Sequence, residues 1–317
     1  MSLAMSLTSQ LKNKESPVKQ FLSESASRLS LAGGRGNAGK DIALEFNFDD
    51  ITTRNIVIPI PDSVDNRRTH SSLIGTAFDY RTRMEIEEFE ILETTAYEGL
   101  SRLDLFSDYF EGGSHMVKIL IDAINISIDS SNSGNQSSLD ELAIILAWCE
   151  SIYRAGIPRI IRGSLGDRLR QSENGTQLLA TIDSLSISDL SSLREASQPQ
   201  IDIWCSEIES GSSFEHNPTF PGSYLVEGAD ADWAIDDTLI ECKTMAKITN
   251  THIRDMLFQL LGYTLLDFDD CFGIRKVAIW LPRYQILKTW SLDQILGQSA
   301  EQKLPELRYD FQQLLCR

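Results

Sequence analysis

The chain has 317 residues, a formal net charge of −17, 42% hydrophobic residues and 24% charged residues. These proportions are typical of a folded protein with a substantial core, so they exclude a wholly disordered chain. No apolar run approaches the roughly 20 residues of a membrane span, and the chain does not open like a signal peptide, so we expect no membrane association. Because so large an acidic excess repels phosphate, a simple polyanion-binding protein is also excluded.

The five cysteines are an odd number, lie far apart in the sequence and include no C-x-x-C pair. A disulfide scaffold would show an even number at compact spacing, and a zinc or iron–sulfur site would show paired cysteines. The cysteine pattern therefore favours a reduced, cytoplasmic protein without such a centre.

The charge is distributed unevenly along the chain. Residues 1–40 carry a net charge of +4, residues 41–150 carry −14, and residues 201–317 carry −8. The segment 154–170 contains five arginines and a single aspartate. If the protein binds nucleic acid, the contacts should come from the N-terminal arm and from this segment, specifically Arg159, Arg162, Arg168 and Arg170. The alternative is that these side chains form an ordinary solvated helix face.

In the first half of the chain, the pattern predicts mainly helices. Residues 1–40 are rich in Ser, Gly, Lys and Asn and are expected to form a flexible basic arm. A strand-like run at 55–61 precedes a helix that begins near residue 72, with further helices at 95–127 and 138–155. A polar loop separates these last two helices, and residues 171–211 are expected to mix short helices with Ser-rich turns.

From residue 216 onward, the pattern changes to that of a mixed sheet. Two short strands are expected within 223–244, joined by a turn at Asp236-Asp237. An amphipathic helix follows over 251–270, and a nearly continuous apolar run at 275–283 predicts a buried strand. The order strand, strand, helix, strand after an earlier helix indicates an α/β (α+β) fold around a small mixed sheet.

Two carboxylates and a lysine are the candidate catalytic group. Asp232 precedes Glu241 by nine residues, which suits a short hairpin that brings their carboxylates together. Glu241 and Lys243 are two apart on a strand and share a face, while Cys242 points to the other face. Two close carboxylates repel each other and commonly bind Mg²⁺ or Mn²⁺, and an adjacent ammonium can orient an attacking water and stabilise charge on a phosphate. These three side chains are the groups that metal-assisted hydrolysis of a phosphodiester requires.

Two further sequence features accompany this group. Gln259 and Tyr263 are four apart on the following helix, so they share one helix face and both offer hydrogen bonds. Upstream, the helix that begins near residue 72 carries Gly75-Thr-Ala-Phe-Asp79.

Taken together, these motifs resemble the RecB-like branch of the PD-(D/E)xK nuclease superfamily. In that branch the upstream helix carries G-T-x-x-H, and here Asp79 stands in place of the histidine, while Ala231-Asp232 stands in place of Pro-Asp. The resemblance implies a restriction-endonuclease-like αβββαβ core with a large helical insertion or accessory region. It also implies a Mg²⁺ (or Mn²⁺) cofactor.

The resemblance assigns a role to each motif residue. Asp232 and Glu241 would be the metal ligands, with Asp79 as a further candidate ligand. Lys243 would be the catalytic lysine. Gln259 and Tyr263 would lie near the nucleic-acid backbone. Asp230 lies on the same strand face as Asp232 by parity and is its rival as a ligand; we prefer Asp232 because its separation from Glu241 suits the hairpin.

The sequence thus predicts three regions: a basic arm at 1–40, a mainly helical region at 41–215 that includes the first core helix at about 72–90, and a catalytic core with C-terminal helices at 216–317. Our leading hypothesis is a cytoplasmic Mg²⁺-dependent nuclease that acts on DNA in defence or repair. The alternatives are a catalytically silent module of the same fold that binds nucleic acid or protein, and an RNA-cleaving, toxin-like nuclease. A protein partner or a homo-oligomer stays open.

Overall fold

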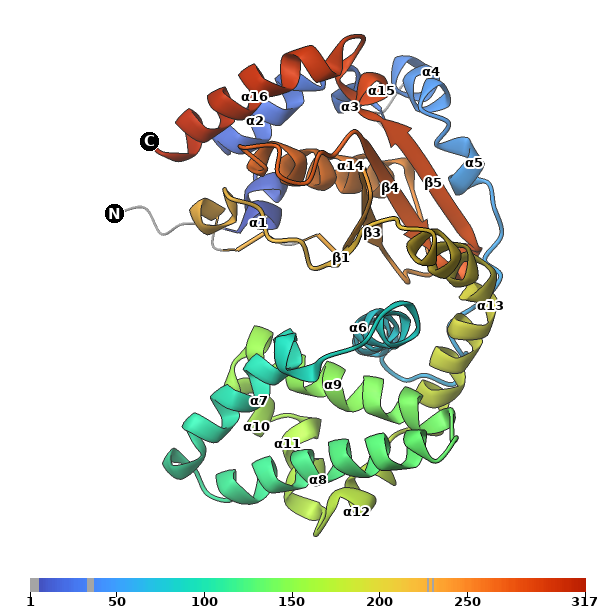
Figure 1. The fold of residues 1–317 in the computed structure, drawn as a ribbon, viewed down its shortest axis with the longest axis vertical. Coiled ribbons are helices and arrows are strands. Elements are labelled where there is room, and N and C mark those ends of the chain that lie inside the picture. Colours follow the sequence, from blue (N-terminus) through green and yellow to red (C-terminus); the bar gives the residue numbers. More distant parts are fainter. Residues whose placement is uncertain (1–5, 33–36, 227, 230) are drawn as a thin grey trace. The chain divides into compact units, whose positions relative to one another are not determined.

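A computed structural model describes residues 6–32, 37–226, 228–229 and 231–317 (Figure 1). The chain divides into two compact units: Met1–Val57 together with Cys205–Arg317, and Ile58–Trp204. We call these the sheet unit and the helical unit. The helical unit is thus an insertion in the sequence of the sheet unit. Asp230, the rival metal ligand, lies outside the described residues. Within the described ranges, no helix is both long and apolar enough to cross a bilayer.

A five-stranded mixed sheet forms the centre of the sheet unit, and its strands follow the chain order. All neighbouring pairs are antiparallel except β3 and β4, which are parallel because helix α14 connects them. The fold is therefore mixed α/β, as the sequence predicts. The strands are β1 (Phe214–His216), β2 (Trp233–Ile235), β3 (Thr238–Cys242), β4 (Lys276–Leu281) and β5 (Ile286–Ser291).

The hairpin between β2 and β3 turns through Asp236 and Asp237, as predicted. Ile235 pairs with Thr238, so the loop has two residues. Asp236 has a φ of 47°, in the left-handed region that aspartate tolerates better than most residues. The Asp236 carboxylate also accepts the backbone N–H of Ser213 at 2.9 Å. The predicted first strand is shorter than expected, because residues 223–226 form a 3₁₀ turn.

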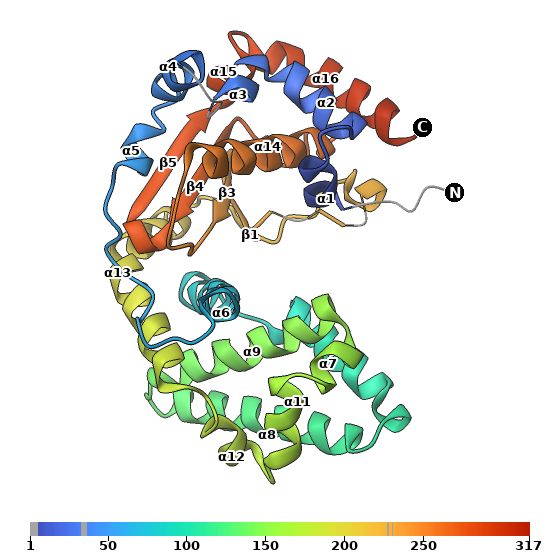
Figure 2. The same ribbon diagram turned by 180° about the vertical axis from the view of Figure 1, so that it is seen from behind.

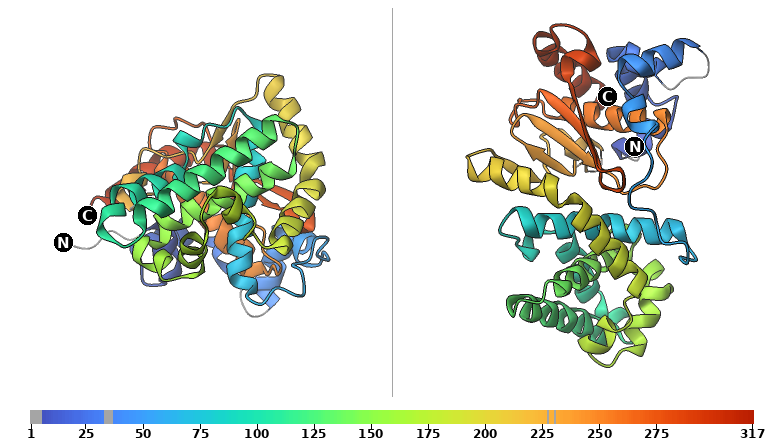
Figure 3. Two further views of the ribbon diagram at one scale, coloured as in Figure 1. Left: turned by 90° about the horizontal axis from the view of Figure 1, so that it is seen from below. Right: turned by 90° about the vertical axis from the view of Figure 1, so that its right-hand side faces the viewer.

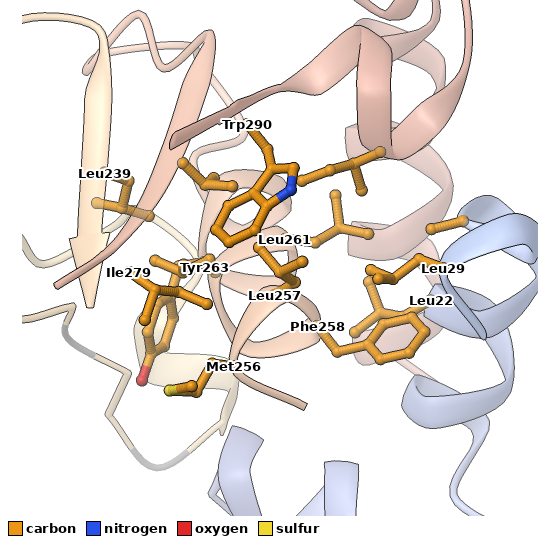
Figure 4. Close-up of a cluster of buried hydrophobic side chains, with 14 of the residues drawn as sticks. Leu22, Leu29, Leu239, Met256, Leu257, Phe258, Leu261, Tyr263, Ile279 and Trp290 are labelled. Atoms are coloured by element: carbon orange, nitrogen blue, oxygen red, sulfur yellow. The ribbon is translucent and has the colours of Figure 1, made fainter. Parts of the chain in front are cut away.

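Helix α14 (Asn250–Leu266) lies at the centre of the sheet unit's hydrophobic core. The helix is apolar on nearly all sides, which is the pattern of a helix buried on every face. Figure 4 shows sheet residues Leu239 and Ile279 on one side of α14 and Leu22 and Leu29 of the N-terminal helices on the other. The core therefore has three layers, with α14 between the sheet and the terminal helices.

The N-terminal segment differs from the flexible arm that we expected. Its described residues form helices, and Leu7, Leu22 and Leu29 are at most 1% exposed. Leu7 packs directly over Gly262 of α14, where a Cβ would come within 2.9 Å of the leucine side chain. The arm is thus part of the core. Its helices are α1 (Leu7–Lys12), α2 (Pro17–Ser25), α3 (Ser27–Leu31), α4 (Asn37–Glu45) and α5 (Asp49–Thr52).

The C-terminal helices complete this outer layer. Helices α15 (Leu292–Leu296) and α16 (Ala300–Leu315) follow β5, and α16 runs beside α2 (Figure 2). Phe21 and Phe311 stack between these two helices with ring centroids 5.4 Å apart. The two ends of the chain are thereby packed against each other through aromatic contact.

The predicted strand at 55–61 does not form. Pro59 and Pro61 interrupt this run and have no N–H group for a sheet ladder. Within the sheet unit, the backbone N–H of Val57 donates to the carbonyl of Arg283 at 2.8 Å. The apolar residues alone were therefore a poor guide to a strand here.

The helical unit, of which every residue is described, contains no strand (Figure 3). The helix predicted from residue 72 exists as α6, and the predicted polar loop is shortened to residues 133–136 because α8 continues through it. Residues 171–211 contain one short helix, α12, and then a single 26-residue helix, α13, where we expected several short helices. The helices are α6 (Arg67–Ile86), α7 (Thr95–Leu105), α8 (Gly113–Asn132), α9 (Ser137–Ala155), α10 (Ile157–Ile161), α11 (Ser164–Gln171), α12 (Gly175–Leu179) and α13 (Ser184–Glu209), of which α13 ends in the sheet unit.

The packing of the N-terminal helices can be tested with two leucines. Leu22 is fully buried, so Leu22→Ala should lower the free energy of unfolding by about 2–5 kcal/mol, the usual cost of removing a core leucine side chain. Leu31 of α3 is 56% exposed, and Leu31→Ala should change it by less than about 0.5 kcal/mol. Urea unfolding followed by circular dichroism measures both; equal effects of the two substitutions would contradict a packed N-terminus.

Candidate functional site

Asp232 and Glu241 face each other across the β2–β3 hairpin. Trp233 pairs with Ile240, and the same register continued by one residue places Asp232 opposite Glu241. Side chains directly opposite each other on an antiparallel pair lie on the same face with Cβ atoms about 5 Å apart. The nine-residue separation in the sequence therefore becomes a cross-strand pair of carboxylates.

Lys243 lies between these two carboxylates. Its Nζ is 2.5 Å from Glu241 Oε1 and 3.4 Å from Asp232 Oδ2. The Glu241 side chain is only 1% exposed, whereas those of Lys243 and Asp232 are 38% and 31% exposed. The group is thus an ion triad with one buried carboxylate and two members at the surface.

The sequence alone did not predict how Asp232 is held. The backbone N–H of Cys242 donates a 2.7 Å hydrogen bond to Asp232 Oδ2, the same oxygen that Lys243 approaches. Because any residue type supplies a backbone N–H, no sequence signal marks this contact; only the register of the hairpin could have indicated it.

The electrostatics favour the charged lysine. Burial opposes the ammonium form, but the Asp232 and Glu241 carboxylates together outweigh this effect and raise the pKa of Lys243 above its ordinary value. Lys243 is therefore a cation at every physiological pH. It acts as a fixed positive charge and hydrogen-bond donor, and not as a general base.

Helix α14 contributes the next two residues of the site. Gln259 Nε2 lies 3.5 Å from Glu241 Oε2 and donates to the Tyr263 hydroxyl at 2.7 Å. Tyr263 sits on the sheet side of α14 beside Ile279 (Figure 4) and stacks on Phe220, with ring centroids 5.9 Å apart. The two residues share a helix face, as predicted, and their chain of contacts ends on the buried carboxylate.

The donor set is compatible with Mg²⁺ but does not form a full protein cage. Among the described residues, no group of three or more His, Cys, Asp or Glu side chains converges on one point. Mg²⁺ commonly binds through one or two carboxylates and completes its shell with waters and substrate phosphates. Asp232 and Glu241, already arranged around one cation, meet this smaller requirement.

Asp79 lies in the helical unit, on α6, where it forms an ion pair with Arg83 one turn later. Burial opposes the charged form of the Arg83 guanidinium, but Asp79 together with Tyr80 and Glu150 outweighs this effect and raises the pKa of Arg83. This contact gives Asp79 a role within the helix bundle. It lends no support to the expected metal ligation.

The four predicted arginines belong to the helical unit. Arg159 and Arg168 line one cavity and Arg162 lines a different one. Arg170 lines neither and binds the carboxylate of Asp167 and the carbonyl of Ile161. Whether these arginines contact nucleic acid stays a prediction.

Comparison with protein-family models, with curated proteins and with solved structures gave no match to this chain. The functional assignment therefore depends on the residues and geometry described above.

The buried ion pair yields a pH-dependent stability prediction. Lys243→Met leaves the Glu241 carboxylate buried without its ammonium, which should cost about 3 kcal/mol at pH 8, the low end for a broken buried pair because Lys243 is partly exposed. In this variant the folded state should favour a protonated Glu241, so it binds more protons than the unfolded state and stability should rise as the pH falls to 5. Urea unfolding at both pH values measures the change.

The matched control is the double variant Glu241→Gln/Lys243→Met, which removes both charges and should recover most of the lost stability without the pH trend. In the native chain, the contribution of the Lys243 charge to the free energy of unfolding is fully present below the pKa of an unfolded lysine, about 10.4. This contribution is therefore constant between pH 5 and 8. A Lys243→Met variant as stable as the native chain at pH 8 would contradict the ion triad.

Proposed function

We propose that this protein is a Mg²⁺-dependent nuclease of the PD-(D/E)xK type that hydrolyses phosphodiester bonds, with DNA as the first substrate to test. One observation carries the proposal: Lys243 Nζ lies within 3.4 Å of both Asp232 and Glu241, which face each other across one hairpin. Two carboxylates that converge on a fixed ammonium at the protein surface are suited to phosphoryl chemistry.

The element order supports a restriction-endonuclease-like core. The helix that directly precedes the strands is α13, not the helix at about 72–90 that we expected as the first core helix; that helix, α6, belongs to the helical unit. From α13 onward the order is three antiparallel strands, a helix (α14) and a parallel strand (β4), which is the αβββαβ sequence of elements. None of the five cysteines, all of which are described, forms a disulfide, and this supports the proposed cytoplasmic location. A role in defence or repair remains part of the proposal.

Each residue of the site has a distinct task in the proposed reaction. Asp232 and Glu241 would hold the divalent ion, which when bound supplies Lewis acidity toward the scissile phosphate. Lys243 would orient the attacking water and stabilise the negative charge that develops on the phosphate oxygens. Gln259 would hold Glu241 in position, while Tyr263 fixes the amide of Gln259.

Metal binding gives the first test of the proposal. Mn²⁺ should raise the melting temperature of the native chain in a concentration-dependent manner, because a ligand that binds only the folded state stabilises it by mass action. Asp232→Asn/Glu241→Gln should abolish this increase. Differential scanning fluorimetry with 0.1–10 mM Mn²⁺, a range on the order of the expected weak affinity, measures it.

Asp255→Asn serves as the control, since Asp255 is an exposed carboxylate of the same unit and pairs with Arg254. It should retain the full Mn²⁺ response. An undiminished response in the Asp232→Asn/Glu241→Gln chain would overturn the metal assignment.

Cleavage by lysine variants gives the second test. Lys243→Met and Lys243→Arg should each lower the turnover of a linear DNA substrate by at least about 100-fold, because a lost transition-state interaction lowers the rate and a planar guanidinium does not replace a compact ammonium. The Mn²⁺ response should persist in both. Lys247→Met, at an exposed lysine four residues later, should cleave like the native chain.

The substrate is identified by cleavage assays with Mg²⁺ or EDTA. The assays use linear, circular and single-stranded DNA, and RNA. Circular dichroism must show folded protein at the assay temperature, because the Lys243 substitutions also affect stability. Cleavage of RNA alone would favour the toxin-like alternative. Binding of nucleic acid without cleavage or metal response would favour the silent module and refute the nuclease.

A further inference from the structure

A cavity of about 820 Å³ lies within the helical unit, and none of Asp232, Glu241 and Lys243 lines it. Its walls come from the start of α6, the second half of α9, helices α10 and α11, and the start of α13. Because all of these segments belong to one compact unit, the cavity is a property of the helical unit itself.

Four arginines line this cavity: Arg68, Arg154, Arg159 and Arg168. The helical unit has only 12 basic residues against 23 acidic ones, so a third of its positive charge is gathered at one place. Only two carboxylates, Glu150 and Asp183, line the same cavity. A strongly acidic unit therefore contains a locally positive hollow.

Two of the arginines are held by the protein. Arg154 donates to Glu150 at 2.6 Å, and Arg168 donates to the carbonyl of Thr181 and lies over the ring of Trp148 at 5.6 Å. Such contacts fix the direction of the guanidinium groups, which favours defined binding of an anion over loose attraction.

Arg68 and Arg159 are different. Both are exposed, and no carboxylate of the described chain forms an ion pair with either. Both guanidinium groups are therefore available for bidentate bonds to a phosphate. They are also suitable test positions, because surface substitutions rarely change folding stability by more than about 0.5 kcal/mol.

The remaining lining suits a ligand that is more than a bare phosphate. Thr69, Ser72 and Thr76 place hydroxyl groups along one face of α6, and Trp148 supplies an aromatic wall. The first turn of α11, at Ser164, has no side-chain cap and carries the partial positive charge of a helix N-terminus. A volume of 820 Å³ falls in the range of small-molecule sites, well above the size of one phosphate ion.

We infer that this cavity binds a nucleotide, with its phosphates on Arg68 and Arg159 and its base and sugar against the hydroxyl-bearing and aromatic walls. A concave hollow admits a compact phosphate ester, whereas a nucleic-acid duplex would need positive charge spread over an extended surface, and four of the unit's arginines are gathered around this one cavity. The inference does not depend on the proposed nuclease activity.

The test measures binding of ATP, GTP, CTP and UTP to the full chain by isothermal titration calorimetry in EDTA, which keeps divalent ions from the Asp232–Glu241 site. At least one triphosphate should bind saturably, with a dissociation constant below about 1 mM. Inorganic phosphate and adenosine should each bind at least about tenfold more weakly, because each satisfies only part of the cavity.

Arg68→Gln/Arg159→Gln should weaken triphosphate binding by at least about tenfold, since two charge-assisted contacts are lost. Arg170→Gln is the matched control, because Arg170 lies on α11 but outside the cavity lining, and it should bind normally. Glu241→Gln should also bind normally, which separates this site from the proposed nuclease site.

Three results would overturn the inference: no triphosphate binds below 1 mM, the arginine double variant binds as the native chain does, or Arg170→Gln loses as much affinity as the double variant. A fourth result that would overturn it comes from a competition experiment with a single-stranded DNA oligonucleotide. If it displaces the nucleotide and loses affinity in the same double variant, the cavity is part of a nucleic-acid surface and not a nucleotide site.

Discussion

The buried carboxylate of Glu241 is the constraint on which the sheet unit's proposed site depends. A charged side chain at 1% exposure is unfavourable unless the protein compensates it, and here the compensation comes from Lys243 two residues along the same strand. Lys243 contacts both Glu241 and Asp232 only while the register of the β2–β3 hairpin keeps these two residues close. Gln259 belongs to the same arrangement, since its amide reaches the second oxygen of Glu241.

The position of Lys243 changes the expected effect of neutralising one of the two close carboxylates on folding stability. Without a cation they would repel each other, and neutralising Glu241 would then stabilise the fold. In the structure Lys243 already supplies a positive charge between them, so neutralising Glu241 removes an attraction as well as a repulsion. The site is therefore stable before any metal arrives.

The sequence predicted the features that depend on short-range pattern. The turn at Asp236, the strand pair around it and a helix after that pair each follow from a local period or a turn residue, and all three are confirmed. The helix differs from the amphipathic one that we expected over 251–270, because α14 ends at Leu266 and is buried on nearly all sides. The closeness of Asp232, Glu241 and Lys243 follows from the residue spacing along the same hairpin. Its catalytic meaning stays a prediction, because geometry alone does not measure a rate.

The errors in the sequence-based prediction come from contacts that no local pattern encodes. Leu7, Leu22 and Leu29 stand in a polar, serine-rich segment, and only their burial with α14 makes that segment part of the core. The run at 55–61 has strand-like residues, but its prolines have no N–H group to donate to a neighbouring strand. Likewise, Arg68 lies outside the basic segment of 154–170 and joins Arg159 only because α6 and α10 line the same cavity.

The position of Lys243 also bears on how a divalent ion would bind. The ammonium and the ion compete for the same two carboxylates, because both are cations and the lysine contacts each acid directly. Binding of the ion alone must therefore displace or repel a charge that the fold holds in place, which limits its affinity. A phosphate that arrives with the ion adds negative charge near the lysine and relieves this repulsion. By this argument, if the proposed function holds, metal and substrate should bind cooperatively, and Lys243 would be the group that couples metal binding to the presence of a phosphodiester.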